Sequence, residues 1–273
     1  MLAEGAHSVA DSTNQIFLLA SLNRSERRPD ENHPFGYGAE RFFWSFLAAV
    51  FIFVSGSLFS IYEGLHRMFS DATPEGHATV AFIVLGIGVV LEGSSLLRAA
   101  RQTEAAARAR RRPFAHHLRE SRDPTTKTVV FEDSAAVLGL FLAAAGLALT
   151  EITGDTLYDG AASVAIGVIL AGIAFLLGRD TKALLIGESA LPEEREALER
   201  VFVEHEAVDE LVELLTMVLA PESLLVAARF DPADELSSRD VEDLASELDR
   251  RLREAVPDVA QVFLDPTRRK VAQ

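Results

Sequence analysis

Long runs of apolar residues occupy the first two thirds of the chain. A bilayer core of about 30 Å is crossed by roughly 20 residues of helix. Four runs meet this length with at most two charged residues each: Phe42–Tyr62 with none, Ala78–Leu97 with Glu92, Thr128–Leu149 with Glu132 and Asp133, and Leu157–Leu177 with Asp159. Leu2–Leu22 is a fifth candidate that contains Glu4, His7 and Asp11. The pattern predicts a membrane-embedded all-α helical bundle over residues 1–180.

Beyond residue 180 the pattern becomes that of a small water-soluble domain, residues 181–273. Residues 192–206 and 237–256 have helical periodicity, and Ser237 with Asp240 forms a capping-box start for the second helix. Residues 208–220, 223–231 and 259–265 are typical of strands. The order helix, strand, strand, helix, strand predicts an α+β domain.

The charge distribution predicts an orientation. The net charge is −15, and residues from 180 onward hold 23 acidic and 11 basic side chains, which argues against nucleic-acid binding. The segments Asn23–Arg41 and Arg98–Lys127 are rich in arginine, whereas Ser70–His77 and Glu151–Thr156 contain no Lys or Arg. By the positive-inside rule the basic segments and the C-terminal domain lie in the cytoplasm. This places residue 1 outside, so we expect one more helix before Met1.

The arginine run Arg108–Arg112 has an alternative interpretation as a lipid or nucleic-acid patch. A topology signal on a helix that ends at Pro113 is favoured. The Ala- and Arg-rich composition favours a bacterial inner membrane.

Ionisable residues at membrane depth are costly, so they usually face a cavity or a partner. Glu4, His7, Asp11 and Asn14 are spaced by 3, 4 and 3 residues and share one helix face. His7 and Asp11 could therefore bind one ion, the alternative being a hydrogen-bonded pair between helices. Asp133 is the second candidate ligand. Glu132 is a weaker one, because it points about 100° away from Asp133 around the helix.

Two further acids have weaker signals. Glu92 and Asp159 could line the pathway or carry protons, with a structural role as the alternative.

Gly139, Gly146, Gly160 and Gly167 recur on the last two apolar runs and predict close helix packing. The chain has no cysteine, so any metal must be held by imidazole and oxygen. We find no nucleophile–base pair, phosphate loop or motif for an organic cofactor, which argues against an enzyme.

Several motifs together resemble the cation diffusion facilitators, a family of zinc transporters. They are HSVAD (7–11), HPFGYGAER (33–41), EDSAAVLG (132–139) and DTLYDGAAS (155–163). The resemblance covers nearly the whole chain and is greatest to a divergent subgroup that includes mitochondrial zinc exporters. It implies six helices around a tetrahedral metal site, with ligands at His7, Asp11 and Asp133. The second histidine of the family is Val129 here, so Glu132, Asn14, Glu92 or water would complete the site.

The resemblance also implies a loop metal site and a dimeric tail. The loop ligands match Asp30 and His33, but a third, often histidine, is Tyr37 here, so we expect a weak site or none. The family's cytoplasmic domain is ferredoxin-like, dimerises and often binds regulatory metal. This domain has a single histidine, His205, so a multi-histidine regulatory site cannot form in it. We expect it to form a homodimer, with metal sensing through His205 and the acidic surface as the alternative.

The function that follows is a secondary transporter that exports a divalent cation in exchange for protons. Zn²⁺ is the expected substrate, with Mn²⁺, Co²⁺ or Fe²⁺ as alternatives because oxygen ligands suit harder ions. The competing hypothesis is a dimeric membrane scaffold or sensor with a vestigial metal site.

Overall fold

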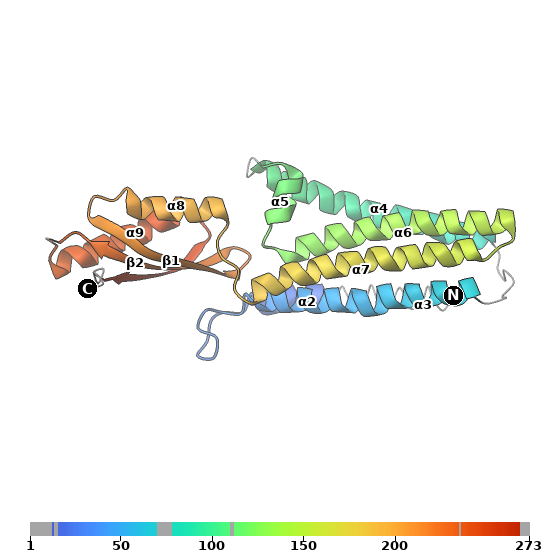
Figure 1. Ribbon diagram of the computed structural model, residues 1–273, viewed down its shortest axis with the longest axis horizontal. Helices are drawn as coiled ribbons and strands as arrows, with labels where there is room; N and C mark the ends of the chain where they lie inside the picture. The colour runs from blue at the N-terminus through green and yellow to red at the C-terminus, as the bar shows by residue number, and fades with distance from the viewer. Residues whose placement is uncertain (1–12, 14–15, 70–77, 110–111, 235, 268–273) are drawn as a thin grey trace, which may run out of the picture. The chain divides into compact units, whose positions relative to one another are not determined.

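The computed structural model (Figure 1) describes residues 13, 16–69, 78–109, 112–234 and 236–267. The chain divides into two compact units. One comprises residues 1–26 and 40–182, and the other comprises residues 27–39 and 183–273.

The first unit is a bundle of long helices. After a helical stretch at residues 16–25, α2 (Glu40–Phe51), η1 (Ile52–Leu58) and α3 (Phe59–Phe69) form one continuous rod. It is followed by α4 (Ala78–Ala109), the short α5 (Phe114–Glu120), α6 (Pro124–Thr153) and α7 (Leu157–Leu185). Within the described residues, four helices are long and apolar enough to cross a membrane: Glu40–Phe69, α4, α6 and α7. Each contains one of the four uncharged or nearly uncharged runs, so the prediction of a membrane bundle is confirmed.

Local signals fix the ends of α6. Pro124 occupies the first turn, where its missing N–H costs nothing, and the Asp123 side chain accepts a hydrogen bond from the Thr125 amide at 3.2 Å. At the other end Gly154 adopts a left-handed conformation with φ of 75°. This closes the helix and lets α7 begin three residues later.

Two features of the first unit differ from the sequence-based prediction. Pro113 directly precedes α5, a short helix that the apolar pattern did not indicate. The rod is also not α-helical throughout, since η1 is a seven-residue π-helix. Such wide turns have no signature in hydrophobic periodicity and often occur near functional sites.

Small residues let the helices approach closely, as predicted for the glycine pattern. A Cβ on Gly146 of α6 would lie 2.6 Å from the Cβ of Ala162 on α7. A Cβ on Gly160 of α7 would lie 2.8 Å from the carbonyl oxygen of Gly64 on α3. Only glycine allows backbones this near one another.

The second unit is an α+β domain with α8 (Pro192–Val203), β1 (Val208–Ala220), β2 (Ser223–Pro232), α9 (Ser238–Ala255) and β3 (Val259–Pro266). Its described residues form a three-stranded sheet in the order β1-β2-β3, antiparallel between β1 and β2 and parallel between β2 and β3. The Ser237–Asp240 capping box starts α9 as predicted. The expected element order is confirmed.

One face of this sheet is covered and the other is open. Alternate residues of β2 are buried: Leu224, Val226, Ala228 and Phe230. The Phe230 ring lies 5.9 Å from the Phe202 ring of α8, so this is the face that α8 covers. On the opposite face, Leu215 pairs with Ala227 and Ala227 pairs with Phe263, which forms one apolar row across the strands. Leu215 and Phe263 are 57% and 51% exposed, although the Phe35 ring lies 6.3 Å from the Phe263 ring. The described part of the chain therefore covers this row only in part.

Candidate functional site

Asp133 lies near the start of α6, nine residues after Pro124, and is half-buried. Its Oδ2 atom is inaccessible to solvent. Val129, one turn earlier on the same face, is also half-buried. It presents only methyl groups at the position where the family motif has a histidine. The described part of α6 thus offers an ion the oxygens of Asp133 and, from a rotated position, those of Glu132.

Glu92 of α4 shares this level of the bundle. The Leu140 side chain on α6 contacts α4 at Gly88, where a Cβ would lie 3.1 Å from it. Asp133 precedes Leu140 by seven residues and Glu92 follows Gly88 by four, so both lie on the faces where α4 and α6 pack. With a rise of 1.5 Å per residue, their levels along the antiparallel helices differ by about 5 Å. The geometry therefore favours Glu92 as a neighbour of the predicted site.

The other predicted ligands, His7 and Asp11, and their neighbours Glu4 and Asn14, lie outside the described residues. Within the part of the chain that is described, no three His, Asp or Glu side chains form a group that could hold a metal ion. Asp133, Glu132 and Glu92 thus do not constitute a complete site by themselves.

Asp159 has a structural partner. At the start of α7 its carboxylate forms an ion pair with Arg67 of α3, which also binds Glu63 with a 3.0 Å contact. Its amide donates to the Thr150 hydroxyl of α6 at 3.2 Å. These contacts join three helices at one end of the bundle. They favour the structural alternative for Asp159 over a role as proton carrier.

The loop residues Asp30 and His33 lie close together in the second unit. His33 Nδ1 is 3.6 Å from Asp30 Oδ1, and the Tyr37 hydroxyl donates to Asp30 Oδ2 at 2.6 Å. The Tyr37 hydrogen bond, together with backbone bonds from His33 and Asn32, lowers the pKa of Asp30 below its ordinary value. The loop keeps an ionised carboxylate beside an imidazole, but Tyr37 occupies one of its oxygens. A loop metal site stays a prediction.

Charged residues that the sequence analysis missed gather where α2 and α6 begin and α4 and α7 end, here called the basic end. Lys127 of α6 is 9% exposed, and its ammonium lies 3.3 Å from Asp180 Oδ2 on α7. Arg41 Nε at the start of α2 is 4.0 Å from Asp123 Oδ1. Lys127 stands directly before an apolar run, which is an ordinary place for a lysine. Its burial could not be inferred from that position alone.

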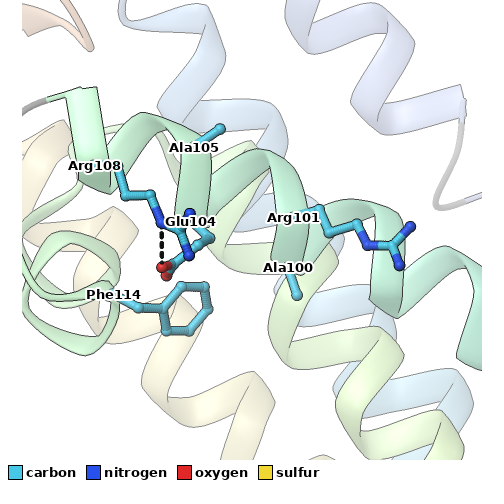
Figure 2. A pocket seen from close by; sticks show the side chains of 6 residues that line it. All are labelled: Ala100, Arg101, Glu104, Ala105, Arg108 and Phe114. Carbon is cyan, nitrogen blue, oxygen red and sulfur yellow. Dashed lines mark hydrogen bonds and ion pairs between the residues drawn. The ribbon is translucent and has the colours of Figure 1, made fainter.

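A shallow hollow between α4 and α5 has no character of a metal site. It is lined by Ala100, Arg101, Glu104, Ala105, Arg108 and Phe114 (Figure 2). Its one carboxylate, Glu104, accepts a hydrogen bond from Arg108 at 2.8 Å, and Arg101 points away from this pair. Phe114 separates the hollow from a second cavity between α5, α6 and α7.

Known proteins resemble the chain over most of its length. Residues 1–186 match the cation efflux transmembrane domain. The chain is 34% identical over 231 residues to metal tolerance protein C4 of Arabidopsis thaliana, covering 85% of this chain and 50% of that protein. It is 36% identical over 209 residues to the mitochondrial proton-coupled zinc antiporter SLC30A9 of Xenopus laevis, covering 76% of this chain and 37% of that protein.

A more distant relative is the magnetosome protein MamB of Magnetospira sp. (strain QH-2), with 24% identity over 180 residues, 66% of this chain and 55% of that protein. The chain spans about half or less of the plant and frog relatives. Since the family match covers more than half of the chain, the chain belongs to the cation efflux family of metal-ion transporters, the cation diffusion facilitators.

Proposed function

We propose that the protein is a secondary transporter that exports Zn²⁺ from the cytoplasm in exchange for protons. The observation that carries the proposal is the half-buried carboxylate of Asp133 on a membrane-spanning helix, at the position matching a family ligand. His7 and Asp11 would supply the other ligands. Relatives with 36–37% identity are named proton-coupled zinc antiporters, which supports the choice of ion and of proton coupling.

Proton exchange follows from the chemistry of the ligands. Carboxylates and imidazole bind a metal ion only when deprotonated, so the ion and protons compete for one site. Alternating exposure of that site to the two sides of the membrane couples the two fluxes. In this proposal Glu92, about one helical turn from the level of Asp133, takes a proton or adds a metal bond.

We further propose that the basic end faces the cytoplasm, that residues 181–273 form a cytoplasmic dimerisation domain, and that the membrane is a bacterial inner membrane. The arginine-rich segments support the orientation. The partly exposed apolar row on the sheet, Leu215–Ala227–Phe263, supports homodimerisation, because exposed apolar surface is unfavourable in water.

The test is uptake of Zn²⁺ by proteoliposomes that contain the full chain, with and without a pH gradient. We expect gradient-dependent uptake that is lost in Asp11→Ala and in Asp133→Ala, because each removes a ligand. Glu151→Ala is the matched control, since Glu151 is an exposed carboxylate near the other end of α6. Uptake that persists in both ligand variants would reject the site.

The scaffold hypothesis rests on Val129, which leaves the predicted site one nitrogen short. Calorimetric titration of the purified chain with Zn²⁺, combined with the uptake assay, discriminates between the two functions. A scaffold binds the ion and shows no proton-driven flux, whereas a transporter shows both.

A further inference from the structure

A cavity of about 360 Å³ lies between α5, α6 and α7 at the basic end, within the first unit. Its size falls within the range of small-molecule sites, roughly 300–1,000 Å³. The transport site does not use it, because Asp133 is not among its lining residues.

The polar rim of the cavity carries an excess of positive charge. Arg119 of α5, Lys127 of α6 and Arg179 of α7 line it, and Asp180 is its one acidic residue. Asp180 is already engaged, with Lys127 at 3.3 Å and Arg179 at 3.7 Å. An ammonium has three donors, so Lys127 keeps donors beyond the one used by Asp180. The rim is therefore suited to an anion and unsuited to a metal cation.

The floor of the cavity is apolar and lies deeper in the bundle. Phe131 stands one turn beyond Lys127 on α6, and Leu176 stands one turn before Asp180 on α7. Leu118 of α5 is 8% exposed and closes the cavity from the side. A ligand in this cavity would thus have a charged end at the rim and an apolar remainder.

The rim lies at the level where both spans leave the hydrocarbon. Lys127 directly precedes the apolar run Thr128–Leu149, and Arg179 comes two residues after the run that ends at Leu177. Phospholipid headgroups occupy this level of a bilayer. Basic pockets between membrane helices are suited to anionic headgroups.

We propose that this cavity binds the headgroup of an anionic phospholipid from the surrounding membrane. Its phosphodiester contacts Arg119, Lys127 and Arg179, and its acyl chains leave along Phe131 and Leu176. The net positive rim favours an anionic lipid over a zwitterionic one, whose headgroup carries its own cation. The site holds α5, α6 and α7 together where Lys127 and Asp180 already pair.

The experiment is native mass spectrometry of the purified full chain in neutral detergent, titrated with phosphatidylglycerol or phosphatidylcholine. We expect phosphatidylglycerol to be retained in preference. Arg119→Gln with Arg179→Gln should weaken its retention about 25-fold, since each basic residue near an anionic headgroup contributes roughly fivefold. Arg98→Gln with Arg101→Gln, two exposed arginines of α4 outside the cavity, removes the same charge and should leave retention within about twofold.

A second variant tests the cavity without changing charge. Ala115 lines it and is exposed, so Ala115→Trp fills the space while the melting temperature in phosphatidylcholine shows that the fold is kept. We expect this variant to lose phosphatidylglycerol retention. Equal losses in the two arginine pairs, unchanged retention in Ala115→Trp, equal retention of phosphatidylcholine, or equal competition by soluble glycerol 3-phosphate would each overturn the proposal.

Discussion

Val129 determines what α6 can offer a metal ion. It lies one turn before Asp133 and is half-buried, so a ligand at this position would point toward the same region of the bundle. A valine leaves the predicted site with one imidazole, that of His7, and a surplus of carboxylate oxygen. Such a ligand set discriminates less strongly for Zn²⁺ over Mn²⁺ than one with two imidazoles.

Restoring the imidazole should change selectivity. In Val129→His we expect the preference of proteoliposome uptake for Zn²⁺ over Mn²⁺ to rise about tenfold. Substitution of a residue that merely supports a metal ligand already changes metal affinity by about tenfold or more. Competition between the two ions in one uptake assay measures it. Leu138→His, which adds an imidazole at an exposed position of the same helix, should leave the ratio unchanged. An equal rise in both variants would show that Val129 is not adjacent to the ion.

The sequence identifies those candidate site residues whose burial in the membrane has a large free-energy cost. A carboxylate within an apolar run, such as Asp133, is conspicuous because hydrocarbon excludes charge. Arg67 and Lys127 stand near helix ends, where charges are common, so their pairing with Asp159 and Asp180 required the three-dimensional structure. The fourth metal ligand depends on packing between helices distant in sequence and was not predictable.

At the scale of elements, α7 is held to its neighbours by glycine contacts. A Cβ on Gly167 would lie 2.9 Å from the Ser57 carbonyl oxygen in η1 and 3.0 Å from the Ile61 amide in α3. These are backbone atoms, which cannot move aside without separating the helices. The contact therefore specifies the distance between α7 and the rod.

Gly167→Ala should destabilise the bundle by about 1–3 kcal/mol, the usual range for overpacking. The readout is the midpoint of thermal unfolding of the purified chain in detergent. Gly172→Ala on the same helix is the control, because a Cβ on Gly172 would have no neighbouring atom within 4 Å. A similar loss in both variants would indicate that helix propensity or lipid exposure, rather than the contact, is measured.

The elements themselves were largely predictable, because hydrophobic length and periodicity report burial directly. The four spans follow from apolar runs of about 20 residues. The order of helices and strands in the C-terminal domain follows from apolar residues that repeat about every 3.6 residues in helices and every second residue in strands. The short α5 was missed, since seven residues after a proline carry too little periodicity to distinguish a helix from a loop. The π-helix was missed because hydrogen-bond register leaves no trace in composition.

At the scale of the whole molecule, the proposed homodimer would use the more exposed face of the sheet. Its apolar row, Leu215–Ala227–Phe263, adjoins a row of charges in which Arg229 binds Asp265 at 2.8 Å and Glu213 at 3.7 Å. An apolar centre beside a charged rim is typical of protein interfaces.

Leu215→Asp should shift the purified chain in detergent from dimer toward monomer, because the carboxylate would be buried without a partner in the interface. Light scattering coupled to size-exclusion chromatography measures the mass of the protein component. Val203→Asp is the matched control, since Val203 at the end of α8 is 74% exposed and lies outside the row. A dimer that survives Leu215→Asp would place the interface elsewhere.

The π-helix η1 has a consequence for how the rod tolerates changes in length. In an α-helix, deletion of one residue rotates everything after it by about 100°. Each ring of a π-helix closes around one more residue than an α-helical ring, so η1 holds a spare residue between α2 and α3. Loss of one residue within Ile52–Leu58 can be absorbed by conversion to α-helix, with Gly64 still turned toward α7. The segment is thus the place in this rod where the chain length can vary while both flanking faces keep their neighbours.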